Sequence, residues 1–167
     1  MSHRDDFAIF ILTHGRADNV DTVKALKKQG YTGRIILMVD DEDKQIPKYK
    51  ANFGKQVHVF SKKAAIAITD SGDNFDQRNS VVYARNYNFV VAKELGIKYF
   101  LQLDDDYTGF RYTFDNDKNY ITRQIAIKSL DVIIEAMLEF YIVSGAKTIT
   151  MSQGGDFIGG EGSKVAK

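Results

Sequence analysis

The 167-residue chain contains no cysteine. This absence excludes disulfide bonds, thiolate nucleophiles and cysteine-rich zinc sites, and it fits a reducing compartment. The N-terminal residues also lack the apolar stretch of a signal peptide. No segment approaches the roughly 20 apolar residues that are needed to span a bilayer. We therefore expect a cytoplasmic protein without a membrane partner.

The chain has almost no net charge, because 23 basic and 22 acidic side chains leave +1 at pH 7. This balance gives no global field of the kind that marks a nucleic-acid-binding protein, although a local basic groove remains compatible with it. The composition, 44% hydrophobic and 27% charged, is typical of proteins that fold in water. At this length we expect one compact domain.

Several catalytic signatures are missing as well. There is no GxxxxGK[ST] loop, which argues against a P-loop nucleoside triphosphatase, and the serines show no nucleophile-elbow pattern. The histidines His3, His14 and His58 do not have the spacing of metal ligands, and among them only His14 stands at the end of a predicted strand. The sequence therefore directs attention to its acidic and arginine side chains.

The apolar pattern predicts strands that alternate with helices. Strands are predicted at residues 7–13, 35–39, 56–60, 98–103 and 147–151. Helices are predicted from a cap at Asp18 or Asn19 to Gly30, and at residues 46–53, 79–95 and 123–143. Residues 64–68 are compatible with a helix, and residues 69–74 have the composition of a turn. This alternation favours an α/β fold with three layers, α/β/α, around a mainly parallel sheet.

Polar clusters follow three of the predicted strands, at residues 13–16, 40–43 and 104–106. Ligands of parallel α/β sheets bind beyond the carboxyl ends of the strands. Neighbouring strand ends converge in space, so we expect the three clusters to form one site. In the second cluster, Asp40 or Asp41 is a candidate for this site, and an exposed acidic loop is the alternative.

Asp104, Asp105 and Asp106 come directly after the apolar stretch YFLQL. Close carboxylates repel one another unless a cation or a basic partner relieves the repulsion. Because side chains alternate along an extended segment, we expect Asp104 and Asp106 to point to one side and Asp105 to the other. Such a pair suits Mg²⁺ or Mn²⁺ held jointly with substrate phosphates, and a solvated acidic turn is the alternative.

Arg85 and Asn86 interrupt the apolar pattern of the predicted helix 79–95. A buried arginine needs a partner. Arg85 therefore either bridges to the aspartates, with Asp105 as the expected partner, or holds a diphosphate, for which its planar fork is suited. The sequence leaves both alternatives open.

The order of these segments resembles the nucleotide-sugar-binding half of a GT-A type glycosyltransferase. FAIFILTHGRADNV, RIILMVDDED and YARNYNFVVAKELGIKYFLQLDDD carry the resemblance. It implies a Rossmann-like GT-A nucleotide-diphospho-sugar transferase fold, a UDP-sugar donor bound through a DxD motif, and Mn²⁺ or Mg²⁺ as cofactor. The implied donor-binding residues are Thr13, Arg16, Asp40, Asp41, Arg85, Asn86, Asp104 and Asp105, and the implied metal ligands are Asp104 and Asp106.

The segments THGRADN, LQLDDDYTGF and GGDFIGG are also similar to phage-type glycosyltransferases associated with modified DNA bases. This narrower resemblance implies that the acceptor is hydroxymethylated DNA. No basic stripe in the sequence adds support for a DNA groove. Composition and spacing by themselves leave the acceptor unidentified.

The resemblance also implies a general base, Asp or Glu, well downstream of the DxD motif. The late carboxylates Asp156 and Glu161 do not stand in a recognisable base motif. We therefore expect residues 1–167 to form a single donor-binding domain that ends before an acceptor-binding half, and the catalytic base is unknown. One alternative is a non-catalytic nucleotide-sugar-binding module or inactive fragment. Another is a sugar-1-phosphate nucleotidyltransferase. Enzymes of that class carry a glycine-rich signature just after the first strand, and the segment THGRADN does not contain it.

Overall fold

A computed structural model describes residues 5–72, 77–117 and 119–151, without the side chains of residues 122–124. These residues divide into two compact units. The sheet unit comprises the described parts of Ser2–Ala25 and Thr32–Thr108, and the hairpin unit those of Leu26–Tyr31 and Gly109–Lys167. The expectation of a single donor-binding domain that ends before an acceptor-binding half stays a prediction.

The sheet unit is built on four parallel strands in the order β3-β2-β1-β4. They are β1 (Phe7–Leu12), β2 (Ile35–Asp40), β3 (Val57–Phe60) and β4 (Tyr99–Asp104). Their carboxyl ends are aligned, because Leu12 pairs with both Met38 and Asp104, and Asp40 pairs with Phe60. The strand order reverses its direction between β1 and β4, which is the switch point where such sheets place ligands.

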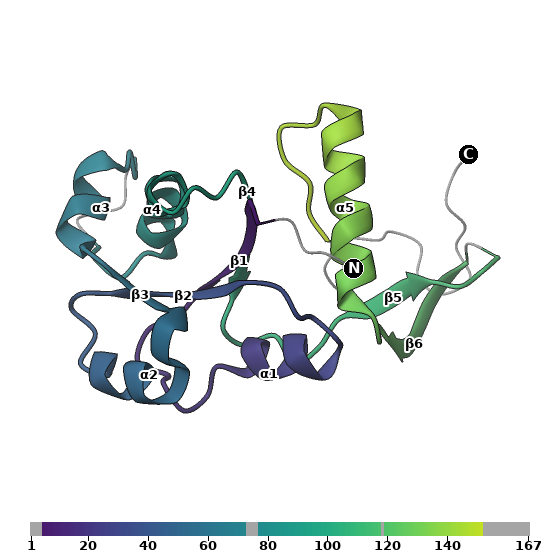
Figure 1. The fold of residues 1–167 in the computed structure, drawn as a ribbon, viewed down its shortest axis with the longest axis horizontal. Coiled ribbons are helices and arrows are strands. Elements are labelled where there is room, and N and C mark those ends of the chain that lie inside the picture. The colour runs from purple at the N-terminus through teal and green to yellow at the C-terminus, as the bar shows by residue number, and fades with distance from the viewer. Residues whose placement is uncertain (1–4, 73–76, 118, 152–167) are drawn as a thin grey trace. The chain divides into compact units, whose positions relative to one another are not determined.

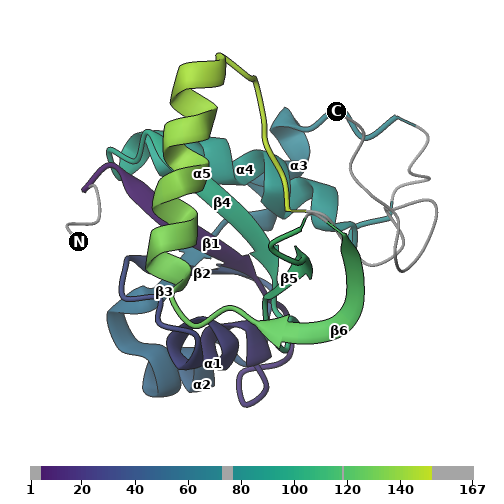
Figure 2. The same ribbon diagram turned by 90° about the vertical axis from the view of Figure 1, so that its right-hand side faces the viewer.

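Helices cover both faces of this sheet. As Figures 1 and 2 show, α3 (Lys62–Ile68) and α4 (Val81–Glu94) lie on one face and α2 (Ile46–Phe53) lies on the other. α1 (Asp21–Lys28) follows β1, and the 3-10 turn η1 (Gly54–Gln56) leads into β3. The predicted alternation of strands and helices around a parallel sheet is confirmed, and it is compatible with a Rossmann-like fold.

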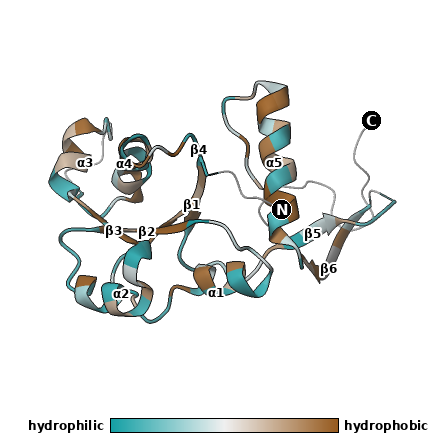
Figure 3. Ribbon diagram, viewed as in Figure 1, coloured by the Kyte–Doolittle hydropathy of each residue, from teal (hydrophilic) through white to brown (hydrophobic). Residues whose placement is uncertain are grey.

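The strands β1 and β2 are buried along their whole length, and Figure 3 shows both as hydrophobic. Strands covered on both faces read as continuous apolar runs rather than as alternating ones, which explains the sequence pattern. On the face that carries α3 and α4, the core consists of Ala8, Phe10, Leu12, Ile36, Met38, Phe60, Ala65, Tyr83, Val91, Ala92 and Ile97. This core fixes the strand ends that position the site.

The hairpin unit contains an antiparallel pair, β5 (Arg111–Phe114) and β6 (Tyr120–Ala126), followed by α5 (Leu130–Ser144). The buried Gln29 side chain joins its segments: Nε2 donates to the carbonyl oxygens of Phe110 and Ile127, and Oε1 accepts the Phe110 N–H. Gly30 has φ +82°, and a Cβ there would lie 2.8 Å from the Lys128 carbonyl oxygen. Only glycine fits that position without a shift of the backbone.

In this region one predicted helix is correct only in part, and one predicted strand is absent. The helix predicted at residues 123–143 begins only at Leu130, because residues 123–126 belong to β6, in which Ile125 and Ala126 pair with Tyr112 and Arg111 of β5. Pairing with a neighbouring strand overrides the helical pattern there. The strand predicted at residues 147–151 is not formed. These residues have irregular structure and are mostly exposed, so their alternating apolar side chains are not buried in a core.

Within the described residues, no helix is both long and apolar enough to cross a membrane. The cytoplasmic location inferred from the sequence stays a prediction. The segment GGDFIGG and the late carboxylates Asp156 and Glu161 lie outside the described residues.

Candidate functional site

A cavity of about 590 Å³ lies along the carboxyl ends of the four strands of the sheet unit. This volume is in the range of small-molecule sites. The strand ends contribute Thr13, His14, Arg16, Asp40, Lys62, Asp104 and Asp105. The segment before α4 contributes Arg78, Asn79 and Ser80, and the first turn of α4 contributes Val81, Tyr83 and Ala84. The structure thus brings side chains of the three predicted polar clusters together, as the topology of a parallel sheet requires.

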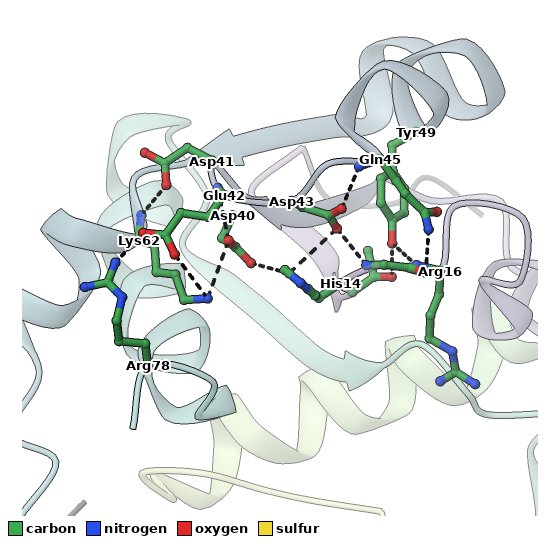
Figure 4. A network of polar contacts seen from close by, with 12 residues as sticks. His14, Arg16, Asp40, Asp41, Glu42, Asp43, Gln45, Tyr49, Lys62 and Arg78 are labelled. Carbon is green, nitrogen blue, oxygen red and sulfur yellow. Dashed lines mark hydrogen bonds and ion pairs between the residues drawn. The ribbon is translucent and has the colours of Figure 1, made fainter. Parts of the chain in front are cut away.

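At the β2 end of the cavity, the buried Asp40 carboxylate has a basic neighbour at each oxygen, as Figure 4 shows. Its Oδ2 lies 2.7 Å from His14 Nδ1, and its Oδ1 lies 3.7 Å from Lys62 Nζ. The Lys62 ammonium also lies 3.7 Å from Glu42, which pairs with Arg78. Buried charges are stable only when they are paired, and here the buried charges of Asp40 and Lys62 each lie beside a group of opposite or basic character.

Asp41 has a different position. Its Oδ1 accepts the backbone N–H of Lys62, the first residue of α3, at 2.9 Å, and Figure 4 shows this contact directed away from His14. A carboxylate at a helix N-terminus satisfies a free N–H group and interacts favourably with the helix dipole. Of the two candidates in the second cluster, Asp40 lines the cavity and Asp41 stabilises the start of α3.

The Asp105 side chain is fastened at the switch point between β1 and β4. The Thr13 hydroxyl donates to its Oδ2 at 2.7 Å, and Arg16 Nη1 donates to its Oδ1 at 2.8 Å. Tyr49 completes the group: its hydroxyl lies 2.8 Å from Thr13 Oγ1 and accepts the Arg16 N–H at 2.8 Å, a bond drawn in Figure 4. Burial raises the pKa of the Tyr49 phenol, which therefore stays protonated at neutral pH.

The expected alternation of the three aspartates is wrong, because β4 ends at Asp104 and the next two residues form a turn. The buried Thr22 holds this turn: its hydroxyl donates to the Asp104 carbonyl oxygen at 2.6 Å, and its N–H donates to that of Asp105 at 3.2 Å. Alternation applies only to extended chain. As a result Asp104 and Asp105 line the cavity, while the Asp106 side chain is 64% exposed.

Arg85 pairs with Asp104, not with Asp105 as expected. Its Nη2 lies 3.0 Å and 3.1 Å from the two carboxylate oxygens of Asp104. Asp105 is turned toward Thr13 instead, which removes it as a partner. Asn86, the next residue on α4, is half-buried, and the described residues that line the cavity do not include it.

Two arginines balance part of the negative charge of the acidic triplet. Arg85 neutralises Asp104, and Arg16 lies 2.8 Å from Asp105 and 3.9 Å from Asp106, so two guanidinium groups face three carboxylates. In the described part of the chain, no group of three or more His, Cys, Asp or Glu side chains could hold a metal ion. Carboxylates are ligands of the kind that Mg²⁺ and Mn²⁺ take together with substrate phosphates and water, so Asp104 and Asp106 as metal ligands stay a prediction.

Comparison with known families decides what kind of protein carries this cavity. The family model of the TET-associated glycosyltransferases matches residues 7–166, a range that includes all the described residues that line the cavity. The chain belongs to this family. Searches of curated proteins and of solved structures gave no match. Membership in the TET-associated glycosyltransferase family supports a transferase that uses a nucleotide-sugar donor and an acceptor, and it bears out the resemblance of the sequence to glycosyltransferases.

Two cations of this family member's cavity were not predicted as site residues, Lys62 and Arg78. Lys62 comes two residues after the end of β3, so the strand-end rule that selected the three clusters would have found it too. Arg78 carries no comparable signal, because its position depends on the contact with Glu42, 36 residues earlier in the chain.

Proposed function

We propose that this chain is a metal-dependent glycosyltransferase domain of the GT-A type. It binds a UDP-sugar through a DxD motif, Asp104 to Asp106, and the sugar is transferred to a hydroxymethylated base in DNA. One observation carries the proposal: in a member of a glycosyltransferase family, one cavity receives polar side chains from the ends of all four parallel strands. The array runs from Lys62 after β3 to Asp104 at the end of β4, which suits an elongated ligand.

The nucleoside is assigned to the end of the cavity at Asp40. There the buried Asp40 carboxylate, an acceptor, lies 2.7 Å from His14 Nδ1 and 3.7 Å from the Lys62 ammonium, a donor. One edge of uracil presents an N–H group beside carbonyl oxygens, so Asp40 can accept from the N–H group and Lys62 can donate to a carbonyl oxygen. Polar groups that match a ligand edge in this way discriminate against bases with another pattern. This complementarity supports a uridine nucleotide.

The diphosphate is assigned to the segment that leads into α4 and to the end of β4. Asn79, Ser80 and Val81 line the cavity at the N-terminus of the 14-residue helix α4, where backbone N–H groups and the helix dipole favour anions. Asp104 and Asp106 would hold Mg²⁺ or Mn²⁺ together with the phosphates. Bound there, the ion stabilises the negative charge that develops on the leaving diphosphate.

The proposed acceptor is the hydroxyl group of a hydroxymethylated base. The hydroxyl oxygen forms a bond to the anomeric carbon, the bond from that carbon to the diphosphate breaks, and the hydroxyl proton passes to a base that we do not name. The similarity of three segments to glycosyltransferases of modified DNA bases supports this acceptor, as does the association with TET in the family's name.

Calorimetry with UDP, in the presence and absence of Mn²⁺, tests the donor site. We expect UDP to bind in the presence of the metal, and the double variant Asp104→Ala/Asp106→Ala to lose the gain that the metal provides. Asp41→Ala is the matched control, because it removes an aspartate that lies outside the cavity. The proposal is wrong if UDP fails to bind with metal, or if it binds the double variant equally well.

A transfer assay tests the acceptor. The chain is incubated with Mn²⁺, a panel of UDP-sugars and a duplex that contains 5-hydroxymethylcytosine, and the DNA is then analysed by mass spectrometry. We expect the mass of one sugar to be added to the modified duplex and none to an unmodified duplex of the same sequence. UDP binding without any transfer would favour the alternative, a non-catalytic nucleotide-sugar-binding module.

A further inference from the structure

We propose that Arg85 is an exchangeable counter-ion of Asp104. It neutralises the carboxylate while no divalent ion is bound, and it is displaced to the donor diphosphate when the ion binds. This inference rests on the proposed function, because it concerns what one side chain does in the same donor site. It assigns to Arg85 both of the roles between which the sequence could not choose, one in each state of the site.

The geometry of the pair blocks the position that a metal ion needs. One nitrogen of Arg85, Nη2, lies 3.0 Å and 3.1 Å from the two Asp104 oxygens, so it stands on the open side of the carboxylate between them. Asp104 lines the cavity at this point. A divalent ion that approaches the same oxygens competes with the guanidinium group for the same charge and the same space.

The pair is also weak enough to exchange. The side chains of Arg85 and Asp104 are 49% and 41% exposed, and ion pairs between exposed side chains contribute little to stability. Arg85 lies in the second turn of α4, and its side chain can change rotamer without disturbing the helix. The displacement therefore requires a change in one side chain only.

The second arginine of the site, Arg16, is about as exposed as Arg85, but its partner is buried and more firmly held. Arg16 donates to Asp105, whose side chain is only 10% exposed and also accepts a hydrogen bond from Thr13. The backbone N–H of Arg16 is in turn held by Tyr49. We therefore assign the two ion pairs different roles. The pair of Arg16 and Asp105 maintains the shape of the site, and the pair of Arg85 and Asp104 responds to the ligand.

Exchange makes two opposite predictions for a variant without the guanidinium group. Arg85→Gln removes a competitor, so the variant should bind Mn²⁺ alone about two- to fivefold more tightly than the wild type. The same variant lacks a charged donor for the diphosphate, so it should bind UDP in the presence of Mn²⁺ about tenfold more weakly. A residue with a purely structural role would not move the two affinities in opposite directions.

The experiment measures both affinities on the same protein samples. Binding of Mn²⁺ alone is followed by the loss of the electron paramagnetic resonance signal of the free ion, and binding of UDP at saturating Mn²⁺ by calorimetry. Arg85→Lys keeps the charge but not the fork, so its Mn²⁺ affinity should stay near the wild-type value while its UDP affinity falls. Lys24→Gln is the matched control for the loss of one exposed, paired cation, and it should change neither affinity.

The outcomes separate this inference from the proposed function. If the wild type shows no UDP binding that depends on Mn²⁺, the proposed donor site is wrong, and this inference fails with it. If the wild type binds as expected but Arg85→Gln leaves both affinities unchanged, or shifts both in the same direction, only the exchange is overturned. Opposite shifts in Arg85→Gln, absent from Lys24→Gln, establish it.

Discussion

The hydroxyl of Thr13 donates a 2.7 Å hydrogen bond to Oδ2 of Asp105, and the bond joins residues that are 92 positions apart in the chain. Thr13 follows β1 and Asp105 follows β4, so this bond crosses the switch point of the sheet. The middle aspartate of the triplet therefore stabilises the fold around the site, whereas the side chains of Asp104 and Asp106 are 41% and 64% exposed. This division gives the three aspartates different expected phenotypes.

Replacement of Asp105 should affect folding more than replacement of Asp106. Asp105→Ala leaves Thr13 and Arg16 without their common acceptor, and we expect the free energy of unfolding to fall by about 1–3 kcal/mol. Asp106→Ala removes an exposed carboxylate, for which a change within about 0.5 kcal/mol is expected. Urea denaturation of both variants measures the difference, and equal stability of the two would contradict the supporting role of Asp105.

Replacement of Asp40 should affect ligand binding, whereas replacement of its neighbour Asp41 should affect stability. Asp40→Asn removes the charge between His14 and Lys62, so we expect UDP to bind at least about tenfold more weakly. Asp41→Ala should leave UDP binding unchanged but lower stability by about 0.5–2 kcal/mol, the usual effect of a lost helix cap. Calorimetry and urea denaturation on the two proteins check both halves, and a loss of UDP binding in Asp41→Ala would show that the assignment is reversed.

Lys62 should matter for the choice of nucleotide. Lys62→Met keeps the apolar stem of the buried side chain and removes the ammonium group that is assigned to a uracil carbonyl oxygen. We expect UDP affinity to fall about tenfold and the preference for UDP over CDP to shrink. Titrations with both nucleotides measure this, and an unchanged ratio of the two affinities would remove Lys62 from base recognition.

Much of the sheet unit could be predicted from the sequence because its signals are local. The continuous apolar runs of β1 and β2 identify strands covered on both faces, and α2 occupies the predicted residues 46–53. The hairpin of β5 and β6 was missed although a signal was present: residues 115–119 have turn composition and stand between segments rich in aromatic and β-branched residues. The helical pattern of α5 was extended to residue 123 in the prediction, and this obscured the strand β6.

The site was predictable in its location but not in its pairings. Strand ends converge in any parallel sheet, which brought Thr13, Asp40 and Asp104 to one cavity. The partner of each aspartate depends instead on contacts that are distant in sequence, such as the hold of Thr22 on the turn after β4. That turn directs Asp105 toward Arg16 and leaves Asp104 to Arg85, and no local pattern encodes its direction.

The remaining prediction concerns pH and His58, which lies on β3 opposite Met38. Burial lowers the pKa of His58 below its ordinary value of about 6.5, and the nearby Glu94 carboxylate opposes part of this shift. Below that ordinary value the unfolded chain binds a proton that the folded chain does not yet bind, so folding becomes less favourable. The contribution of His58 to stability is thus complete above about pH 6.5 and is lost as the pH falls through the folded pKa.

His58→Gln removes this titration and should make stability less sensitive to acid. We expect the difference in urea midpoint between about pH 8 and about pH 5 to be smaller in the variant than in the wild type. Other groups titrate in the same range, so the comparison between the two proteins carries the test rather than either curve alone. An equal acid sensitivity of wild type and His58→Gln would mean that burial of this imidazole does not oppose its protonation.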